Sequence, residues 1–256
     1  MYARRVDLGI DGRVALVMAA SRGIGRGIAV ALAREGARVA VSSRSAERLS
    51  EVVDEIGEAA MPFVADTDDL ERLAALPAEV EAALAPIEIL VLNTGGPPPG
   101  TALDHGTDDW EEAYRSLVLA PRVLTAAVIP GMRSRGWGRI VNVGSSSTRE
   151  PIPYLSLSNT HRMAAVGSLK TLAGEVAGDG ITVNTVATGK FATDRLAIQA
   201  GSLEQAEADA RRDVPGGRLG RPEEYGDLVA FLCSERAAYL TGTVIPLDGG
   251  LLRAAF

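Results

Sequence analysis

The residues best suited to chemistry near the start of the chain are two glycines in the segment Ser21-Arg-Gly23-Ile-Gly25. Glycine lets a backbone approach a phosphate closely, and the first turn of a helix presents free N–H groups and a partial positive charge. Ile24, Ile28 and Leu32 recur every four residues, which predicts one face of a helix. A Gly-x-Gly pair alone is weak, but its position between an apolar run and a helix predicts a nucleotide-binding loop.

The elements that would position this loop alternate along the chain. Short apolar runs predict buried parallel strands over residues 13–18, 38–42, 62–65, 87–92, 139–143, 181–186 and 243–247. Periodic segments predict a helix from residue 24 to Gly36 and further helices over residues 46–56, 69–84, 108–132, 159–177 and 223–234. Because proline removes a backbone hydrogen bond, we expect Pro77 to break or kink the helix over 69–84.

This alternation predicts the α/β class. We expect a single domain over residues 1–256, a Rossmann-type doubly wound parallel sheet with helices on both faces. Residues 190–217 differ from the rest of the chain in composition, because they are mostly small, polar and charged. They are a candidate substrate lid, and an inert surface excursion is an equally good interpretation.

Composition excludes several classes of function. The 256 residues are 46% hydrophobic and carry a net charge of −7, which disfavours binding to nucleic acid or to an anionic membrane. Cys233 is the only cysteine, so no intrachain disulfide is expected and a reducing compartment fits. The N-terminus lacks the apolar region of a signal peptide, and no apolar run reaches the ~18 residues of a membrane span. We therefore expect a cytoplasmic protein without a metal site.

Five segments, in chain order, resemble the motifs of the short-chain dehydrogenase/reductase family. They are the loop from Met18 to Gly25, Asp66-Thr67, Leu92-Asn-Thr-Gly95, Asn184-Thr-Val-Ala-Thr-Gly189, and Thr241-Gly242 with Asp248-Gly-Gly250. The matches span nearly the whole chain, so the resemblance implies the family's fold, nucleotide cofactor and redox activity, with 3-oxoacyl-(acyl carrier protein) reductase-like proteins as the nearest type. Met18 and Ala19 stand where Thr and Gly are usual. Alanine tolerates positive φ poorly, so we expect this loop to sit differently or to bind more weakly.

The resemblance implies a set of cofactor-binding residues. They are Ser21, Arg22, Gly23, Ile24, Gly25, Arg44, Asp66, Thr67, Asn93, Gly95, Arg162, Gly189 and Thr193. The second strand ends without the acid that would hold the ribose hydroxyls and repel a 2′-phosphate. Arg44 and Arg22 can instead face that phosphate, which favours NADP(H) over NAD(H). Alternatively, Arg44 is a solvated residue before a helix.

The family's catalytic group is the least well matched part of the resemblance. Family enzymes carry an Asn, a Ser and a Tyr-x-x-x-Lys, whereas this chain has no Tyr-x-x-x-Lys. Alignment on the flanking motifs places Ser145 at the serine, Ser158 at the tyrosine, Arg162 at the lysine and Leu117 at the asparagine. Ser158 and Arg162 keep the i, i+4 spacing of one helix face. Arg162 can retain the ribose-binding role but cannot relay protons, because it stays charged.

Three other residues are candidate proton donors. Tyr154 lies just before the helix, Lys190 follows Gly189, and His161 neighbours Arg162. Tyr154 is the preferred candidate. For each residue taken singly, packing or a solvated surface position is the plainer interpretation.

The sequence therefore predicts an atypical NADP(H)-dependent oxidoreductase of the carbonyl reductase or alcohol dehydrogenase type, with Ser145, Tyr154, Ser158 and Arg162 as its catalytic residues. The alternatives are non-redox chemistry on the same scaffold, as in an isomerase, dehydratase or cyclase, and a cofactor-binding partner without chemistry. The resemblance also implies a homotetramer. The apolar tail over residues 251–256 would otherwise be exposed.

Overall fold

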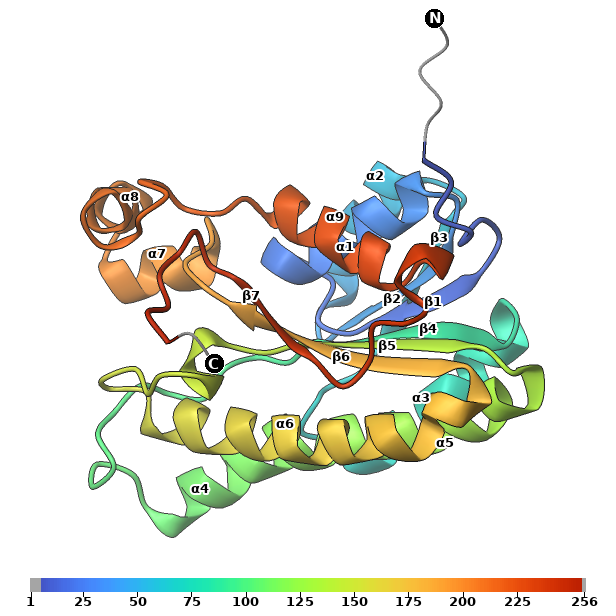
Figure 1. Ribbon diagram of the computed structural model, residues 1–256, viewed down its shortest axis with the longest axis horizontal. Coiled ribbons are helices and arrows are strands. Elements are labelled where there is room, and N and C mark those ends of the chain that lie inside the picture. Colours follow the sequence, from blue (N-terminus) through green and yellow to red (C-terminus); the bar gives the residue numbers. More distant parts are fainter. Residues whose placement is uncertain (1–5, 255–256) are drawn as a thin grey trace, which may run out of the picture.

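The computed structural model describes residues 6–254, whose strands form one seven-stranded sheet (Figure 1). The strands are β1 Val14–Val17, β2 Arg38–Ser43, β3 Ala60–Val64, β4 Ile87–Leu92, β5 Gly138–Val143, β6 Ile181–Thr188 and β7 Val244–Leu247. Every neighbouring pair is parallel, in the order β3-β2-β1-β4-β5-β6-β7. The order reverses between β1 and β4, which is the point where doubly wound sheets bind ligands. The predicted fold class is confirmed.

Helices cover both faces of the sheet (Figure 1). One face carries α1 Gly23–Arg34, α2 Ala46–Ile56 and α9 Pro222–Leu232, and the other carries α3 Leu70–Ala83, α5 Ala120–Arg135 and α6 Ser156–Val176. Helix α4 Thr107–Tyr114 continues through a π-helical turn, η1 Arg115–Leu119, into α5.

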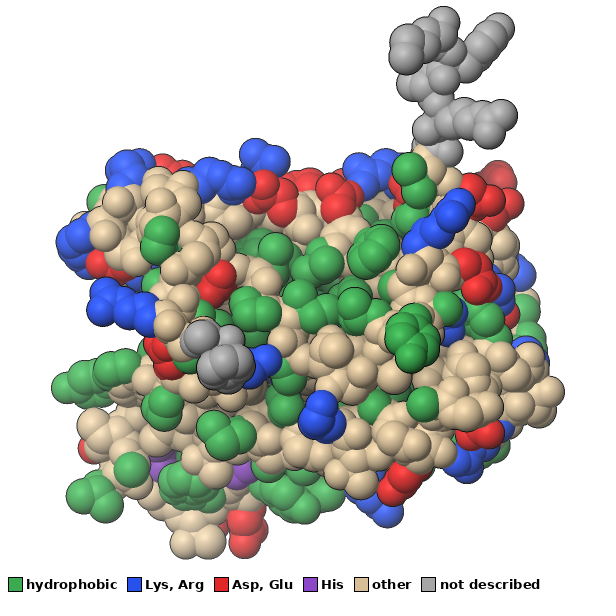
Figure 2. Space-filling view, in the orientation of Figure 1, with side chains coloured by type: hydrophobic (Ala, Val, Ile, Leu, Met, Phe, Trp, Pro, Cys, Tyr) green, Lys and Arg blue, Asp and Glu red, His purple; other side chains and the backbone are tan. Residues whose placement is uncertain are grey.

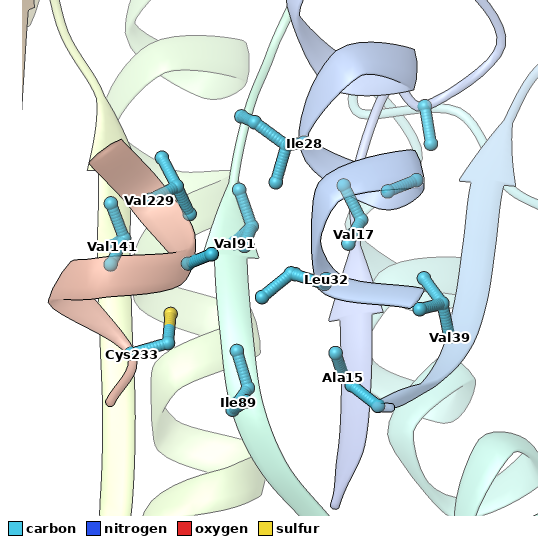
Figure 3. Close-up of a cluster of buried hydrophobic side chains, with 14 of the residues drawn as sticks. Ala15, Val17, Ile28, Leu32, Val39, Ile89, Val91, Val141, Val229 and Cys233 are labelled. Carbon is cyan, nitrogen blue, oxygen red and sulfur yellow. The ribbon is translucent and has the colours of Figure 1, made fainter. Parts of the chain in front are cut away.

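The strands are apolar throughout because both of their faces are buried. Successive side chains of a strand point to opposite faces. Ala15 and Val17 of β1 pack with Ile28 of α1 and Val229 of α9 (Figure 3). Leu16, between them, belongs to the second hydrophobic layer, under α3, α5 and α6. This two-sided burial explains why continuous apolar runs, and not alternating patterns, predicted the strands.

Helices α1 and α9 approach each other through two glycines. A Cβ on Gly27 would overlap the backbone of Pro222 at the start of α9. A Cβ on Gly226 would overlap the carbonyl oxygen of Gly27 and lie 2.7 Å from the Cβ of Ala31. One side of α1 is therefore covered by a helix that lies some two hundred residues later in the chain.

One expectation about helices requires correction, and the candidate lid contains two helices. Helix α3 runs unbroken through Pro77, so the expected break is wrong. Pro77 is buried in α3 beside Leu73, Leu76 and Val80 of the same helix, and this burial compensates for the lost backbone hydrogen bond. Residues 190–217 are largely helical, with α7 Asp194–Ala200 and α8 Leu203–Asp213. The Thr193 and Ser202 side chains cap these two helices, and caps of this kind are strong start signals.

The continuous helical stretch Thr107–Arg135 is long and apolar enough to cross a membrane by length and composition. The sequence-based expectation that no segment reaches this length therefore needs qualification. In this fold, Leu124, Val128 and Met132 of the stretch are buried against the sheet with Ile140 and Leu169. A core helix satisfies the same length and composition test.

Hydrophobic side chains gather in the middle of one face, where α9 and β7 lie (Figure 2). Phe231 in α9 is 41% exposed, and Tyr239, in the segment before β7, is fully exposed. Leu251 and Leu252 of the tail are half-buried, whereas residues 255 and 256 of the predicted apolar tail lie outside the described residues. Such apolar surface is compatible with self-association, and the homotetramer stays a prediction.

The glycine contact between α1 and α9 can be tested with paired substitutions. Gly226→Ala should lower the free energy of unfolding by about 1–3 kcal/mol, because a new methyl group meets backbone atoms that cannot move aside. Gly174→Ala in α6 is the matched control, since a Cβ at this exposed helical position would have no neighbour within 4 Å. It should raise stability by about 0.5–1 kcal/mol. Urea unfolding followed by circular dichroism measures both, and equal effects would contradict the proposed packing.

Candidate active site

The predicted site residues lie at one edge of the sheet. Because all strands are parallel, the loops that follow them meet at the same edge. The loop 18–22 follows β1, Arg44 follows β2, Asp66 and Thr67 follow β3, Asn93 and Gly95 follow β4, Ser145 follows β5, and Gly189 and Thr193 follow β6. Ser158 and Arg162 reach this edge from the first half of α6.

The loop after β1 is held in a strained conformation. Ala19 has φ +46°, in the left-handed region that disfavours residues with a Cβ. Its carbonyl oxygen accepts a hydrogen bond from Nδ2 of Asn93 at 3.3 Å. A Cβ on Gly25 would overlap this same oxygen and lie 2.7 Å from the Asn93 amide nitrogen. Gly25 is thus required by the close approach of α1, and the expected strain at Ala19 is present.

The start of α1 is available to an anion. Its N-cap residue, Arg22, makes no side-chain cap hydrogen bond, and the first turn contains no acidic residue. The free N–H groups and the positive end of the helix dipole therefore have no competing protein anion in this turn. The pyrophosphate of a dinucleotide fits this combination of an uncapped helix start and an obligatory glycine.

Helix α7 lies against this loop. A Cβ on Gly23 would be 3.2 Å from Cγ2 of Thr193, and Nη1 of Arg22 lies 3.4 Å from Oδ2 of Asp194. Arg22 therefore faces α7. The sequence led us to expect that Arg22 and Arg44 would face one 2′-phosphate together, whereas Arg22 here pairs with Asp194. Arg44 is exposed and lies 3.9 Å from the carboxylate of Asp66.

Arg162 joins three elements at the centre of the site. Its Nε donates to Oγ of Ser158 at 3.2 Å, and its Nη1 donates to the carbonyl oxygen of Val143 at the end of β5 at 2.9 Å. Its Nη2 lies 3.5 Å from the carbonyl oxygen of Gly95, after β4. Burial, together with the nearby charge of Arg195, lowers the pKa of Arg162 to about 10. The guanidinium still carries its charge at neutral pH.

The hydroxyl groups of the two predicted serines have different partners. Ser145 is two residues beyond Val143 in the sequence, and its Oγ accepts a hydrogen bond from the backbone N–H of Ser147 at 3.1 Å. Ser158 is 7% exposed and directs its hydroxyl to Arg162, not into the apolar core. The predicted pairing of Ser158 with Arg162 is present in the structure.

The three candidate proton donors differ in their surroundings. Lys190 forms an ion pair with Asp213 at 2.8 Å. His161 packs against the ring of Trp110, and its Nδ1 lies 2.8 Å from the carbonyl oxygen of Leu157. Tyr154 is 69% exposed, and within residues 6–254 its hydroxyl has no hydrogen-bond partner.

Tyr154 also has an unusual backbone, with φ +60°. Its carbonyl oxygen accepts a hydrogen bond from Gly100, which ties the loop before α6 to the loop after β4. Left-handed residues with side chains are rare and cluster at functional sites. Leu117, at the position of the family's asparagine, is buried in η1 and offers no polar group.

Sequence reasoning missed Arg195. This residue of α7 donates from Nη2 to the carbonyl oxygen of Pro97 at 3.3 Å. Its guanidinium lies directly over Gly96, where a Cβ would overlap it. Thr193, two residues earlier, is among the cofactor-binding residues that the resemblance implies. No sequence signal shows that the Arg195 side chain extends from α7 to the loop after β4.

Comparison with known proteins identifies the family of the chain. Residues 18–252 match a family model described as enoyl-(acyl carrier protein) reductase. The chain is 36% identical to human dehydrogenase/reductase SDR family member 4, over 94% of this chain and 88% of that protein. The chain belongs to the short-chain dehydrogenase/reductase family. A 3-oxoacyl-(acyl carrier protein) reductase of Haemophilus influenzae is 33% identical, over 94% of this chain and 99% of that protein.

A solved structure of the same family has nearly the same fold. The L-sorbose reductase of Gluconobacter frateurii, complexed with NADPH and L-sorbose, superposes with a TM-score of 0.93. It is 31% identical and covers 97% of this chain and 100% of its own. As a short-chain dehydrogenase/reductase, the chain is an NAD(P)-dependent oxidoreductase.

The strain at Ala19 leads to a stability prediction. Ala19→Gly should raise the free energy of unfolding by roughly 1 kcal/mol, because glycine adopts the left-handed conformation without the Cβ penalty. Ala75→Gly, at an exposed position inside α3, is the matched control and should lower stability by about 1 kcal/mol. Thermal unfolding of the three proteins measures the difference. A loss of stability in both variants would show that the loop is not strained.

Proposed function

We propose that this chain is an NADP(H)-preferring carbonyl reductase in which Ser145, Ser158 and Arg162 occupy the positions of the family's usual serine, tyrosine and lysine. The observation that carries this proposal is the hydrogen bond from Arg162 to Ser158, with the same guanidinium anchored on Val143 at the end of β5. The i, i+4 spacing of the pair is that of the family's tyrosine and lysine, which supports the alignment. Family membership favours redox chemistry over an isomerase, dehydratase or cyclase, and over a partner without chemistry.

The proposed cofactor site follows the edge of the sheet from β3 to β6. The segment Ser21 to Gly25 holds the pyrophosphate at the start of α1, Asp66 and Thr67 hold the adenine, and Asn93, Gly95, Gly189 and Thr193 surround the nicotinamide half. Arg44 binds the 2′-phosphate, and Arg162 binds the nicotinamide ribose. Bound NADPH supplies the hydride.

The chain's own residues position the substrate and stabilise charge. The hydroxyl groups of Ser145 and Ser158 can donate hydrogen bonds to a carbonyl oxygen, and the Arg162 charge stabilises the negative charge that develops on it. Arg162 has an electrostatic role and not that of the acid, because a guanidinium keeps its protons and its charge in proteins. Lys190 is engaged by Asp213, which leaves Tyr154 or an ordered water as the proton donor. Assembly as a homotetramer and a cytoplasmic location belong to the same proposal.

The cofactor preference can be tested at Arg44. Arg44→Ala should weaken NADPH binding about ten- to a hundredfold and leave NADH binding nearly unchanged, because a charge-assisted contact contributes roughly 1.5–3 kcal/mol. Arg38→Ala removes the same charge at the opposite end of β2 and should change neither affinity. Fluorescence titration with both nucleotides measures the effect. Equal affinity of the parent protein for NADPH and NADH would refute the preference.

The alignment of the catalytic residues can be tested by restoring the family's pair. Ser158→Tyr combined with Arg162→Lys should raise NADPH-dependent reduction of simple ketones by about a hundredfold or more, since a positioned general acid contributes 10²–10⁴-fold. Ser158→Tyr alone should give less, because the bulkier Arg162 guanidinium keeps its anchors on Val143 and Gly95 and cannot take part in proton relay. Initial rates with NADPH measure both variants.

A second part of the same experiment tests whether Tyr154 is the proton donor. Tyr154→Phe in the parent should reduce turnover while NADPH affinity is retained. Intact turnover would assign the proton to water, and a double variant without ketone reduction would show that the alignment is wrong.

A further inference from the structure

Two arginine side chains meet at the substrate end of the site without an acidic partner. Arg162 contacts the carbonyl oxygen of Gly95, and the guanidinium of Arg195 covers the adjacent Gly96. Among residues 6–254, the hydrogen-bond partners of both arginines are carbonyl oxygens and one serine hydroxyl. Burial lowers the pKa of both groups, and the charge of Arg195 further lowers the pKa of Arg162.

An uncompensated pair of like charges is costly. Arg162 is half-buried and Arg195 is exposed, so the cost falls chiefly on Arg162, whose charge lacks an acidic partner and is repelled by that of Arg195. The chain as a whole has a net charge of −7, so acidic side chains are plentiful. Elsewhere, Arg13, Arg26 and Arg218 each bind a carboxylate. An anion that binds from solution would supply what Arg162 and Arg195 lack.

The cofactor's phosphates do not account for Arg195. On α7, Thr193 and Asp194 face the glycine loop, through Gly23 and Arg22. Arg195 points to the loop after β4, where it contacts Pro97. The pyrophosphate belongs at the start of α1, and the 2′-phosphate belongs beyond β2. The nicotinamide ribose, which Arg162 would bind, carries no negative charge. The second positive charge is therefore left for the substrate.

We infer that the substrate is a small carbonyl compound or alcohol that carries an oxyanion, a carboxylate or a phosphate, and that Arg195 binds this group beside Arg162. Arg195 remains exposed enough for a ligand to reach it from solvent. A planar guanidinium suits both oxyanions, because it presents parallel N–H groups to two oxygens. This inference rests on the proposed function, which places carbonyl chemistry at Ser145, Ser158 and Arg162, and it adds the class of substrate.

Binding to the full chain saturated with NADP+ tests the inference without turnover. Isothermal titration calorimetry compares acetoacetate with methyl acetoacetate, and dihydroxyacetone phosphate with dihydroxyacetone. In at least one pair, the anionic member should bind at least tenfold more tightly, and that pair identifies the oxyanion. Arg195→Gln should remove the preference, a loss of about ten- to a hundredfold, and Arg195→Lys should restore part of it. Arg211→Gln on α8, which removes an exposed charge from the same segment, should keep the preference.

Three results would overturn the inference. One is that neither anionic probe binds more tightly than its neutral counterpart. Another is that Arg195→Gln keeps the preference. The third is that Arg195→Gln weakens NADPH binding tenfold and leaves the probe preference intact, which would assign Arg195 to the cofactor. Failure of the proposed function has a different signature, because the parent would then reduce neither the charged nor the neutral carbonyl compounds with NADPH.

Discussion

The parallel direction of all seven strands is the constraint on which the rest of the structure depends. Each strand must be followed by a segment that returns along the sheet, so helices cover both faces and the strands are buried on both sides. The same constraint brings every loop that follows a strand to one edge. Residues inside the strands are held by packing, whereas residues at the edge can change without disturbing the core. In the proposed alignment, the serine and arginine at positions 158 and 162 are changes of this second kind.

Under the proposed alignment, an arginine stands at position 162 where the family has a lysine, and this difference has a physical consequence at the edge of the sheet. An ammonium group is a compact charge, whereas a guanidinium presents a planar set of donors. Arg162 uses that set to contact the ends of β4 and β5 and a hydroxyl on its own helix. It thus fastens α6 to the sheet where a lysine would make fewer fixed contacts. This attachment is gained at the expense of proton relay, because a guanidinium does not exchange protons near neutral pH.

The sequence was sufficient for the sheet and for the outline of the site. Apolar runs predicted the strands because two-sided burial leaves no room for polar residues, and family motifs placed the loops that follow them. It was insufficient for Pro77, where tertiary burial outweighs helix propensity, and for α7 and α8, where polar composition concealed two capped helices. The sequence also could not predict the partners of Arg22 and Arg195. They depend on how far a side chain extends between segments that are about one hundred or more residues apart, and no local pattern encodes that distance.

The glycine contact between α1 and α9 also sets an order of events during synthesis. One side of α1 is covered by Pro222 and Gly226, so it stays open until the ribosome has added nearly two hundred residues beyond Gly27. The first strands and helices emerge much earlier, with Ile28 and Leu32 lacking the neighbours on α9 that bury them in the finished protein. The nascent chain therefore carries an exposed apolar surface for most of its elongation. Contacts of such long sequence separation form late and leave intermediates open to aggregation. The helix that would bind the cofactor is among the first to be made and among the last to be packed.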